Sequence, residues 1–553
     1  MRKFDLGSKK QPAAAGHPDV DAVVIGAGFA GLYMVYRLRQ LGLTMQGFEK
    51  GSDVGGVWYW NRYPGARCDV ESMQYSYSFS EELQQQYRWS ERFAAQPEIL
   101  AYAEHVAERF DLRRDIAFDT GVTAAQYDEK SGFWTIRTDQ GASLTARFCI
   151  MATGCLSSTR TPEIAGLAYF KGQVFHTGNW PHDKVDFSGQ RVGVIGTGSS
   201  GIQCIPVIAQ QARQLFAFQR TPNFSIPARN VPMTAQREGA WKENYAALRR
   251  QAREETTSGT LYEKSERKAH ETDAPERDAE SGRRWDAGGV NFMHSFIDLM
   301  RDLKSNDTAA QFVRGRIKAI VADPTTAALL TPQGYPIGSK RICIDTEYYA
   351  TYNRDNVTLV DLRAAPIERL TATGLQTKEA HYDLDCIVFA TGYDAMTGAL
   401  SKIDIVGRAG QTLAHKWEAG PRTYLGLMMA GFPNLFTITG PGSPSVLANM
   451  IFAIEQHVEW IADCLHWMGQ RELDTIEADV AAENDWVDHV NEVADQTLFP
   501  LANSWYVGAN VPGKPRVFMP YVGGVVPYRR KCDEVAANDY EGFRLTSTQP
   551  APA

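Results

Sequence analysis

The chain has 553 residues, of which 44% are hydrophobic and 22% charged, an ordinary globular composition with room for two or three domains. Its net charge of -8 argues against nucleic acid as a partner, because phosphate backbones are bound by basic patches. A membrane span is not expected either. The most apolar run, "TYLGLMMAGFPNLFTITG", is interrupted by Gly426, Gly431 and Pro433.

The amino end lacks the apolar segment of a secretory signal, and we expect a loosely ordered arm over the first residues. Eight cysteines are scattered along the chain without a CxxC pair, which predicts free thiols in a reducing, cytoplasmic location. We also find no HExxH and no GxSxG. The sequence therefore predicts no metal site.

A first glycine-rich loop follows an apolar run over 22–25 and precedes a segment with helical spacing from Phe29. Gly26, Gly28 and Gly31 form a GxGxxG, in which glycine allows a tight turn, a close approach of a pyrophosphate and close packing of helix on strand. The next predicted strand ends at Glu49, an acid suited to a ribose hydroxyl. Together these features predict a site for FAD or NAD.

A second loop, with Gly196, Gly198 and Gly201, follows a predicted strand over 191–195. The strand after it ends at Arg220, where the first unit has an acid. A guanidinium can bind a 2′-phosphate that a carboxylate would repel, which favours NADP here. The alternative is that Arg220 is only a solvated surface charge.

Two apolar runs end in the same tripeptide, Ala-Thr-Gly, at 152–154 and 390–392. Because they flank the second glycine loop, we expect the chain to cross between domains near 155 and 390. The predicted fold class is α/β, with two dinucleotide-binding (Rossmann-like) domains and a charged, helical insertion in the second. The expected divisions are 1–155 and 391–553 for FAD, with a mobile loop near the carboxyl end, 156–226 and 337–390 for NADP, and 227–336 for the insertion.

The segment between the loops, "FKGQVFHTGNWP", matches FxGxxxHxxxWP, which resembles the fingerprint of the type I Baeyer–Villiger monooxygenases, class B flavin monooxygenases. Similar blocks are "GGVWYWNRYPGARCDVES", "GSKRICIDTEYYATYNRDNV" and "ANSWYVGANVPGKPRVFMPYVGG". The resemblance runs from about 20 to 545. It implies NADPH- and O2-dependent insertion of one oxygen next to a ketone carbonyl through a C4a-peroxyflavin, giving an ester or lactone, with FAD and NADPH as cofactors and no obligate protein partner.

The resemblance implies two catalytic residues. Arg341 keeps its charge at any working pH, so it can favour an anionic peroxide and stabilise the adduct that follows carbonyl attack. Asp69 is the carboxylate expected to orient it. For each residue, a structural ion pair is the alternative.

His176, Trp180 and Trp505 are expected to act in conformational changes, with Trp505 on a mobile loop that contacts NADP. A buried histidine without such a role and a tryptophan that anchors its loop are the alternatives. The expected FAD-binding residues are Gly26, Gly28, Gly31, Glu49, Val57, Trp58, Asp69, Tyr75, Val122 and Met450. The expected NADP-binding residues are Thr197, Gly198, Ser199, Ser200, Gly201, Arg220, Thr221, Lys340, Arg341 and Trp505.

The substrate pocket is expected to include Val70, Cys155, Ser445, Val446 and Leu447. The phenylacetone-oxidising members of the family resemble this chain most. However, Cys155 stands where they have glutamine and Val446 where they have alanine, so their substrate preference is not implied. Two other functions stay open: a class B monooxygenase that oxygenates sulfur or nitrogen, and an NADPH-binding flavin redox sensor. Trp180, Pro181 and Arg341 favour ketone oxidation over the first, and the pair of Asp69 and Arg341 argues against the second.

Overall fold

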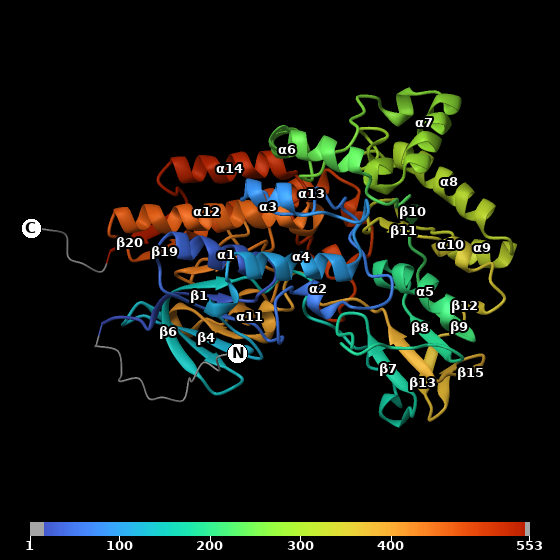
Figure 1. The fold of residues 1–553 in the computed structure, drawn as a ribbon, viewed down its shortest axis with the longest axis horizontal. Coiled ribbons are helices and arrows are strands. Elements are labelled where there is room, and N and C mark those ends of the chain that lie inside the picture. Colours follow the sequence, from blue (N-terminus) through green and yellow to red (C-terminus); the bar gives the residue numbers. More distant parts are fainter. Residues whose placement is uncertain (1–15, 548–553) are drawn as a thin grey trace, which may run out of the picture.

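The computed structural model describes residues 16–547, so the arm expected at the amino end lies outside the described residues. Two large sheets organise the chain (Figure 1). Strands of the first sheet come from 20–151 and 404–437, and strands of the second from 173–219 and 357–389. The expected domain divisions near 155 and 390 fall in the segments between these sets, and the divisions themselves stay a prediction.

The first sheet has eight strands in the order β17-β4-β5-β6-β1-β2-β3, with β18 beside β6. Its centre is parallel, whereas β5 runs antiparallel to β4 and β6. Successive residues of β1 from Ala22 to Ile25 enter hydrophobic cores on opposite faces, which explains why this part of the strand is an unbroken apolar run. The strands are β1 Val20–Ile25, β2 Met45–Phe48, β3 Ile116–Ala117, β4 Val122–Asp128, β5 Phe133–Thr138, β6 Ser143–Met151, β17 Asp404–Val406 and β18 Leu435–Thr437.

The second sheet is parallel throughout, in the order β12-β9-β8-β16-β7. Its strands are β7 Gln173–His176, β8 Arg191–Ile195, β9 Gln214–Gln219, β12 Val357–Asp361 and β16 Cys386–Phe389. Three small sheets complete the strands: β10 Ser225–Pro227 with β11 Cys343–Asp345, β13 Ile367–Leu370 with β14 Gly374–Thr377 and β15 His381–Asp383, and β19 Thr475–Ala478 with β20 Phe543–Thr546.

Long helices cover one face of the first sheet. Figure 1 shows α1, α12 and α14 layered above β1, and their side chains share one hydrophobic core with that strand. Their bounds are α1 Phe29–Gln40, α12 Met450–Gln470 and α14 Val525–Ala537. The other helices outside the insertion are α2 Val57–Trp60, α3 Glu81–Gln86, α4 Gln96–Arg109, α5 Ser199–Gln211, α10 Tyr348–Thr351, α11 Leu413–Lys416 and α13 Val480–Asp495.

The insertion is built from α6 Ala235–Glu255, α7 Ala274–Ala287, α8 Leu303–Ile320 and α9 Pro324–Leu330. It does not pack on one sheet alone: Tyr245 of α6 belongs to the core shared by α1 and α12, whereas Trp285 of α7 and Val313 of α8 belong to the core of β8 and β9. The insertion is helical as expected, but residues 256–268, between α6 and α7, are irregular. The reason is local, because Gly259 lies at a φ of +68° that helices exclude.

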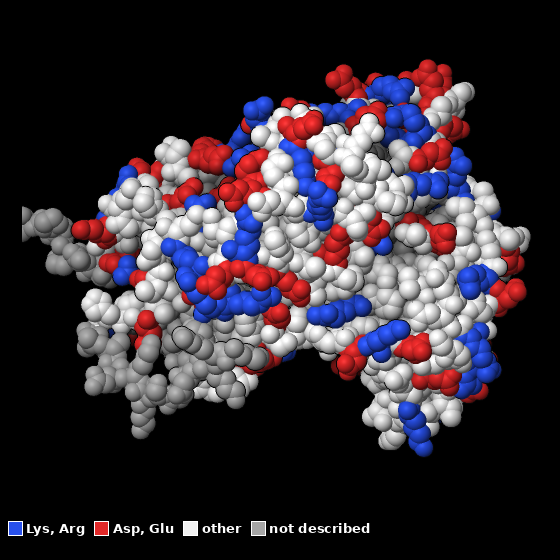
Figure 2. All heavy atoms as spheres, in the orientation of Figure 1, with Lys and Arg blue, Asp and Glu red and all other residues white. Residues whose placement is uncertain are grey.

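Among residues 16–547, no helix is long and apolar enough to cross a membrane. Figure 2 shows acidic and basic side chains interspersed over the visible face rather than gathered into one basic patch. All eight cysteines are buried and free. The mixed charge on the visible face and the free cysteines agree with the globular α/β protein that the sequence predicts.

Candidate active site

A cavity of about 2080 Å³ is lined by residues from the loops of both main sheets. Both glycine-rich loops open onto it, and so do the segment around Asp69, the segment around Arg341 and the turn that carries Trp505. Residues that are hundreds of positions apart in the chain therefore share one space. This is the arrangement expected where two nucleotides and a small substrate meet.

The two glycine loops are built in the same way. Gly26 and Gly196 have φ values of +109° and +110°, and a Cβ on either would lie 2.5 or 2.4 Å from the carbonyl oxygen of Ala152 or Ala390. Those alanines open the two Ala-Thr-Gly tripeptides. Each tripeptide is thus the neighbouring strand end that the loop crosses at close range, which spacing alone did not reveal.

The third glycine of each loop lies behind the cavity wall rather than on it. A Cβ on Gly31 would lie 1.8 Å from the Gly26 carbonyl oxygen, and one on Gly201 would lie 2.1 Å from that of Gly196. These residues therefore act by letting the helix approach its strand. The helices α1 and α5 begin after Gly28 and Gly198 without a side-chain cap, so their first amides are left for an anionic ligand.

Glu49 lies directly after β2, is 7% exposed and lines the cavity. Its two oxygens accept hydrogen bonds from the amides of Ala27 (2.8 Å) and Gly51 (2.7 Å). Burial raises the pKa of Glu49, and these amide bonds offset part of the effect. The carboxylate is held in place beside the first loop, and each oxygen keeps a lone pair for a ribose hydroxyl.

Of the other expected FAD residues, Val57, Tyr75, Val122 and Met450 line the cavity. Trp58 does not line it. Instead its indole nitrogen donates a hydrogen bond to the Tyr75 hydroxyl at 3.2 Å, so Trp58 supports the wall from behind.

Beside the second loop, Arg220 and Lys340 bring two cations to the cavity together with Thr221. The Lys340 ammonium lies 4.4 Å from the centre of the Tyr335 ring, and burial together with the Arg220 charge lowers its pKa. Among the described residues, no carboxylate pairs with either cation. Thr197, Gly198, Ser199 and Ser200 line the same part of the cavity. A site with unneutralised cations next to a helix amino terminus suits a phosphate.

Arg341 and Asp69 form an ion pair at the cavity wall, where the arginine side chain is 31% exposed and the aspartate 24%. The Nε and Nη2 of Arg341 donate to Asp69 Oδ2 at 2.9 and 2.5 Å, and Nη1 donates to the Val446 carbonyl at 2.8 Å. Burial disfavours the charged form, yet Asp69 and the Tyr506 phenol raise the pKa of Arg341 above its ordinary value. The guanidinium is therefore a fixed cation with its orientation set.

Tyr506 was missed by the sequence analysis although it touches Arg341. It lies in the 3-10 turn Trp505–Val507 and is 1% exposed. Burial raises its pKa to about 12, against the effect of the Arg341 charge. The neighbouring Trp505 lines the cavity, as expected for a nucleotide contact, and its ring centre lies 4.2 Å from that of Tyr506.

His176 and Trp180 do not line the cavity. The amide of Gly178 donates to His176 Nδ1 at 3.0 Å, which leaves the ring proton on Nε2 facing the Arg160 carbonyl at 3.2 Å. The Thr391 hydroxyl donates to the same carbonyl at 3.0 Å, so the Arg160 carbonyl, which follows the first tripeptide, joins His176 to the second tripeptide. Burial lowers its pKa, which favours the neutral ring.

Trp180 is 4% exposed and packs on Phe175, while its amide donates to the Trp60 carbonyl at 3.0 Å. This bond joins the segment after β7 of the second sheet to the end of α2. Both fingerprint residues therefore sit at contacts between distant segments. Their conformational role stays a prediction.

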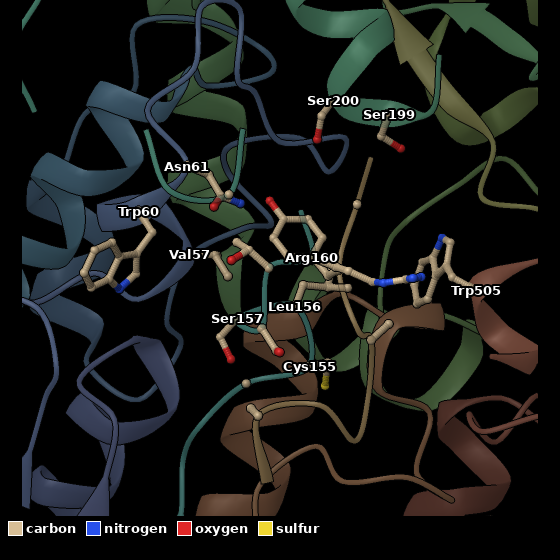
Figure 3. Close-up of a pocket in the computed structure, with 18 of the residues that line it drawn as sticks. Val57, Trp60, Asn61, Cys155, Leu156, Ser157, Arg160, Ser199, Ser200 and Trp505 are labelled. Carbon is tan, nitrogen blue, oxygen red and sulfur yellow. The ribbon is translucent and has the colours of Figure 1, made fainter. Parts of the chain in front are cut away.

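Three of the five expected substrate-pocket residues, Val70, Cys155 and Val446, line the cavity, whereas Ser445 and Leu447 do not. The Cys155 thiol lies 3.0 Å from the Ser445 hydroxyl and 3.1 Å from the Thr439 carbonyl. Burial raises the pKa of Cys155, so it is a neutral, packed thiol. Figure 3 shows its sulfur at the pocket, followed along the chain by Leu156 and Ser157.

No group of three or more potential metal ligands occurs within residues 16–547.

A profile of the flavin-binding monooxygenase-like family matches residues 20–231. A Baeyer–Villiger monooxygenase of Pseudooceanicola batsensis is 43% identical over 527 residues, covering 94% of this chain and 95% of the relative.

The chain belongs to the Baeyer–Villiger monooxygenases.

Two solved structures resemble this Baeyer–Villiger monooxygenase over nearly its whole length. One is oxidised steroid monooxygenase bound to NADP, 55% identical with a TM-score of 0.92, covering 96% of this chain and 99% of the other. The other is OTEMO in complex with FAD and NADP, 42% identical with a TM-score of 0.93, covering 96% and 100%. Relatives of this Baeyer–Villiger monooxygenase also include the phenazine N-monooxygenase PhzNO1 of Lysobacter antibioticus, 41% identical over 95% of this chain and 97% of the relative.

Several residues at the cavity of this Baeyer–Villiger monooxygenase were not named as site residues from the sequence. Figure 3 shows the Arg160 side chain extending toward Trp505, with Trp60 and Asn61 across the pocket. Arg160 stands near the first tripeptide and Tyr393 next to the second, both at the cavity. Their position beside the crossings was the only available clue.

Proposed function

We propose that the chain converts a small ketone, NADPH, a proton and O2 into an ester or lactone, NADP+ and water. The observation that carries this proposal is the Arg341–Asp69 pair at a cavity that both glycine loops share. A positive charge with free N–H donors is needed beside the reacting oxygen, because negative charge develops there during attack on the carbonyl.

The residues around the first loop fit FAD. Gly26 and Gly28 have no side chain, so a pyrophosphate can approach their backbone and the uncapped start of α1. Glu49, held by backbone amides, is placed to bind a ribose. The residues that would hold FAD are Gly26, Gly28, Glu49, Val57, Asp69, Tyr75, Val122 and Met450, with Gly31 and Trp58 in support.

The residues around the second loop fit NADPH. Arg220, Lys340 and Thr221 would hold the 2′-phosphate, because two unpaired cations there select a phosphate over a hydroxyl. Thr197, Gly198, Ser199, Ser200, Arg341 and Trp505 would contact the rest of the nucleotide, with Gly201 in support. When bound, FAD and NADPH supply the electrons and the activated oxygen.

Arg341 supplies the positive charge that stabilises negative charge during the reaction. Asp69 and the Val446 carbonyl accept three of its hydrogen bonds, and the Tyr506 phenol contacts it as well, so the charge and the N–H groups left over are held in a fixed orientation at the cavity wall. They favour an anionic nucleophile and then bind the oxyanion formed from the ketone oxygen. Asp69 acts by orienting this guanidinium.

The ketone is proposed to lie against Val70, Cys155 and Val446. These side chains are small, and the Cys155 thiol is already engaged by Ser445 and Thr439. The wall therefore offers shape rather than strong hydrogen bonds, which suits an apolar ketone whose only polar group is its carbonyl. Ser445 and Leu447 would shape this wall from behind.

Oxygenation at nitrogen is a second candidate function, because the phenazine N-monooxygenase is nearly as similar in sequence as the Baeyer–Villiger monooxygenase of Pseudooceanicola batsensis.

The location is proposed to be cytoplasmic, supported by the free, buried state of all eight cysteines.

The test is a product analysis of the FAD-loaded protein with NADPH and air. A panel of linear, aryl and cyclic ketones would be compared with an aryl sulfide and a phenazine at equal concentration. We expect esters or lactones that are heavier than the ketone by one oxygen, formed in proportion to the NADPH consumed. An N-oxide or sulfoxide formed faster than any ester would favour the second function.

A further inference from the structure

Residues 503–516 form a compact loop that is separate from the elements before and after it. The loop closes on itself: the Gly508 amide donates to the Trp505 carbonyl at 3.1 Å, Ala509 to Ser504 at 3.0 Å and Val511 to Gly508 at 3.2 Å. Because these bonds lie inside the loop, they fix its shape but not its position on the protein. Its position depends on contacts with other segments.

Lys514 makes the strongest of those contacts. Its ammonium donates to Asp394 Oδ1 at 2.6 Å and to the Ala395 carbonyl at 2.8 Å. The lysine side chain is 11% exposed and the aspartate 30%, so this pair is better shielded from water than an ordinary surface pair. Inside the loop, Gly508 has a φ of +70°, and a Cβ there would lie 3.2 Å from Lys514 Cγ. The lysine stem thus packs on the glycine at the loop's turn.

A second tie lies next to the first. The Asn510 side chain donates to the Tyr393 carbonyl at 2.6 Å, and Arg160 Nη1 donates to the Asn510 carbonyl at 2.8 Å. Arg160 follows the first Ala-Thr-Gly tripeptide, and Tyr393 to Ala395 follow the second. The loop is therefore attached to both segments that connect the two main sheets, and Figure 3 shows Arg160 reaching toward it.

The loop brings two aromatic side chains to the site. Trp505 lines the cavity, and the buried Tyr506 lies against Arg341. The amide of Met519 donates to the Tyr506 carbonyl at 2.9 Å, which joins Tyr506 to the segment that follows the loop. A shift of the loop would move the indole on the cavity wall and the phenol beside the guanidinium together.

We propose that Lys514 is a positioning residue that, through its bonds to Asp394 and Ala395, fixes the 503–516 loop so that Trp505 meets the nicotinamide nucleotide and Tyr506 supports Arg341. This inference rests on the proposed function for its kinetic consequences, but not for its structural ones. Lys514 does not itself line the cavity, so its effect must pass through the loop.

The test compares Lys514→Met with Lys514→Arg and with a matched control, Lys531→Met. The control removes a lysine that is 38% exposed and pairs with Glu534 at 3.5 Å on α14, away from the loop. We expect Lys514→Met to raise the KM for NADPH about tenfold, the usual effect of losing a charged hydrogen bond. It should also increase the hydrogen peroxide released per NADPH, while kcat changes less. Lys514→Arg should recover most of the KM.

Hydrogen–deuterium exchange of the FAD-loaded protein without NADPH gives a readout that needs no turnover. In Lys514→Met the amides within 503–516 should exchange about tenfold faster, while those of α12 and β8 keep their rates. Equal loop exchange in Lys514→Met, Lys531→Met and the unchanged protein would overturn the inference, and so would an unchanged KM for NADPH. If the unchanged protein oxygenates no substrate, the proposed function fails, whereas faster loop exchange in Lys514→Met would still support the loop's attachment.

Discussion

Arg341 is surrounded by groups that determine how it can act. Asp69 binds two of its nitrogens through one oxygen, and Val446 receives a third hydrogen bond through its backbone carbonyl. The backbone contact means that the part of the wall formed by Val446 also helps orient the cation. A change in the substrate pocket can therefore alter the chemistry as well as the fit.

Replacing Asp69 by Asn tests this orientation. Asn keeps the size of the side chain but removes the charge that holds the guanidinium, so we expect kcat for ketone oxidation to fall about 10- to 100-fold. Glu71→Gln is the matched control. Glu71 lies two residues after Asp69 and also pairs with arginines, Arg92 and Arg237, but it does not line the cavity. Steady-state oxygenation rates for the two variants decide the matter: equal losses would mean that Asp69 is only structural.

We propose that Arg220 determines which nicotinamide nucleotide binds. Arg220→Ala should raise the KM for NADPH about 100-fold and leave that for NADH within about threefold, since only NADPH has the 2′-phosphate. Arg213→Ala, at an exposed position just before β9, serves as the control. A parallel rise for both nucleotides in Arg220→Ala would show that Arg220 supports the fold rather than the phosphate.

For single residues, the sequence motifs predicted which side chains lie at the cavity better than they predicted which side chains contact them. Asp69 and Arg341 were expected to pair and do so. Tyr506 and Arg160 were not expected, because their contacts are made with residues far away in the chain and have no fixed spacing. Ser445 and Leu447 lie behind the wall because the turn that holds them points Val446 inward instead.

The packing of α5 on β8 depends on the absence of a side chain at Gly201. A Cβ on Gly201 would lie 2.1 Å from the Gly196 carbonyl oxygen, which is backbone and cannot move aside. We expect Gly201→Ala to lose about 1–3 kcal/mol of stability by overpacking and to lose NADPH binding as α5 shifts from β8.

The matched control for that variant is Gly315→Ala in α8, where nothing lies within 4 Å of the added Cβ. It should instead gain about 0.4–1 kcal/mol, because alanine favours helix and restricts the unfolded chain. Thermal unfolding and NADP+ titration of both variants provide the comparison. Retained NADP+ affinity in Gly201→Ala would contradict the proposed packing.

Strands and helices near the loops were predicted to within a few residues, since apolar runs and glycine spacing are local signals. The second loop's strand, β8, has the predicted bounds, and β1 begins two residues earlier than expected. The irregular stretch at 256–268 was not predicted. Its charged composition favours helix, but the backbone at Gly259, with a φ of +68°, overrides that preference.

Across the whole molecule, buried histidines make stability depend on pH. His457 of α12 is 1% exposed, its Nδ1 accepts a hydrogen bond from the Thr439 amide, and burial lowers its pKa to about 3. An unfolded histidine has a pKa near 6.5. The stabilisation is therefore present above about pH 6.5 and is lost progressively as pH falls toward 3, because the unfolded chain takes up the proton first.

We accordingly expect His457→Gln to flatten the fall in the free energy of unfolding between pH 6.5 and 5, by about 1.4 kcal/mol per pH unit. His466→Gln, at an exposed position on the same helix, should leave the slope unchanged. Urea unfolding at several pH values measures both. A His457→Gln slope that matches that of the unchanged protein would show that another group governs acid unfolding.

The arrangement of the whole chain follows from two large sheets, one mixed and one parallel, whose connecting segments meet at one cavity. The sequence indicated this arrangement through its repeated glycine loops and tripeptides. It did not indicate that the insertion joins both cores, because that contact depends on where α6 lies after folding.

The most direct test of oxygen insertion is the position of the new oxygen atom. The FAD-loaded protein would oxidise a ketone with NADPH under ¹⁸O₂, and the ester would then be hydrolysed with base in ordinary water. Our account predicts that the alcohol fragment carries one ¹⁸O and the acid none, since the atom enters between the carbonyl and the migrating carbon. Unlabelled ester, or ¹⁸O found only in hydrogen peroxide, would contradict it.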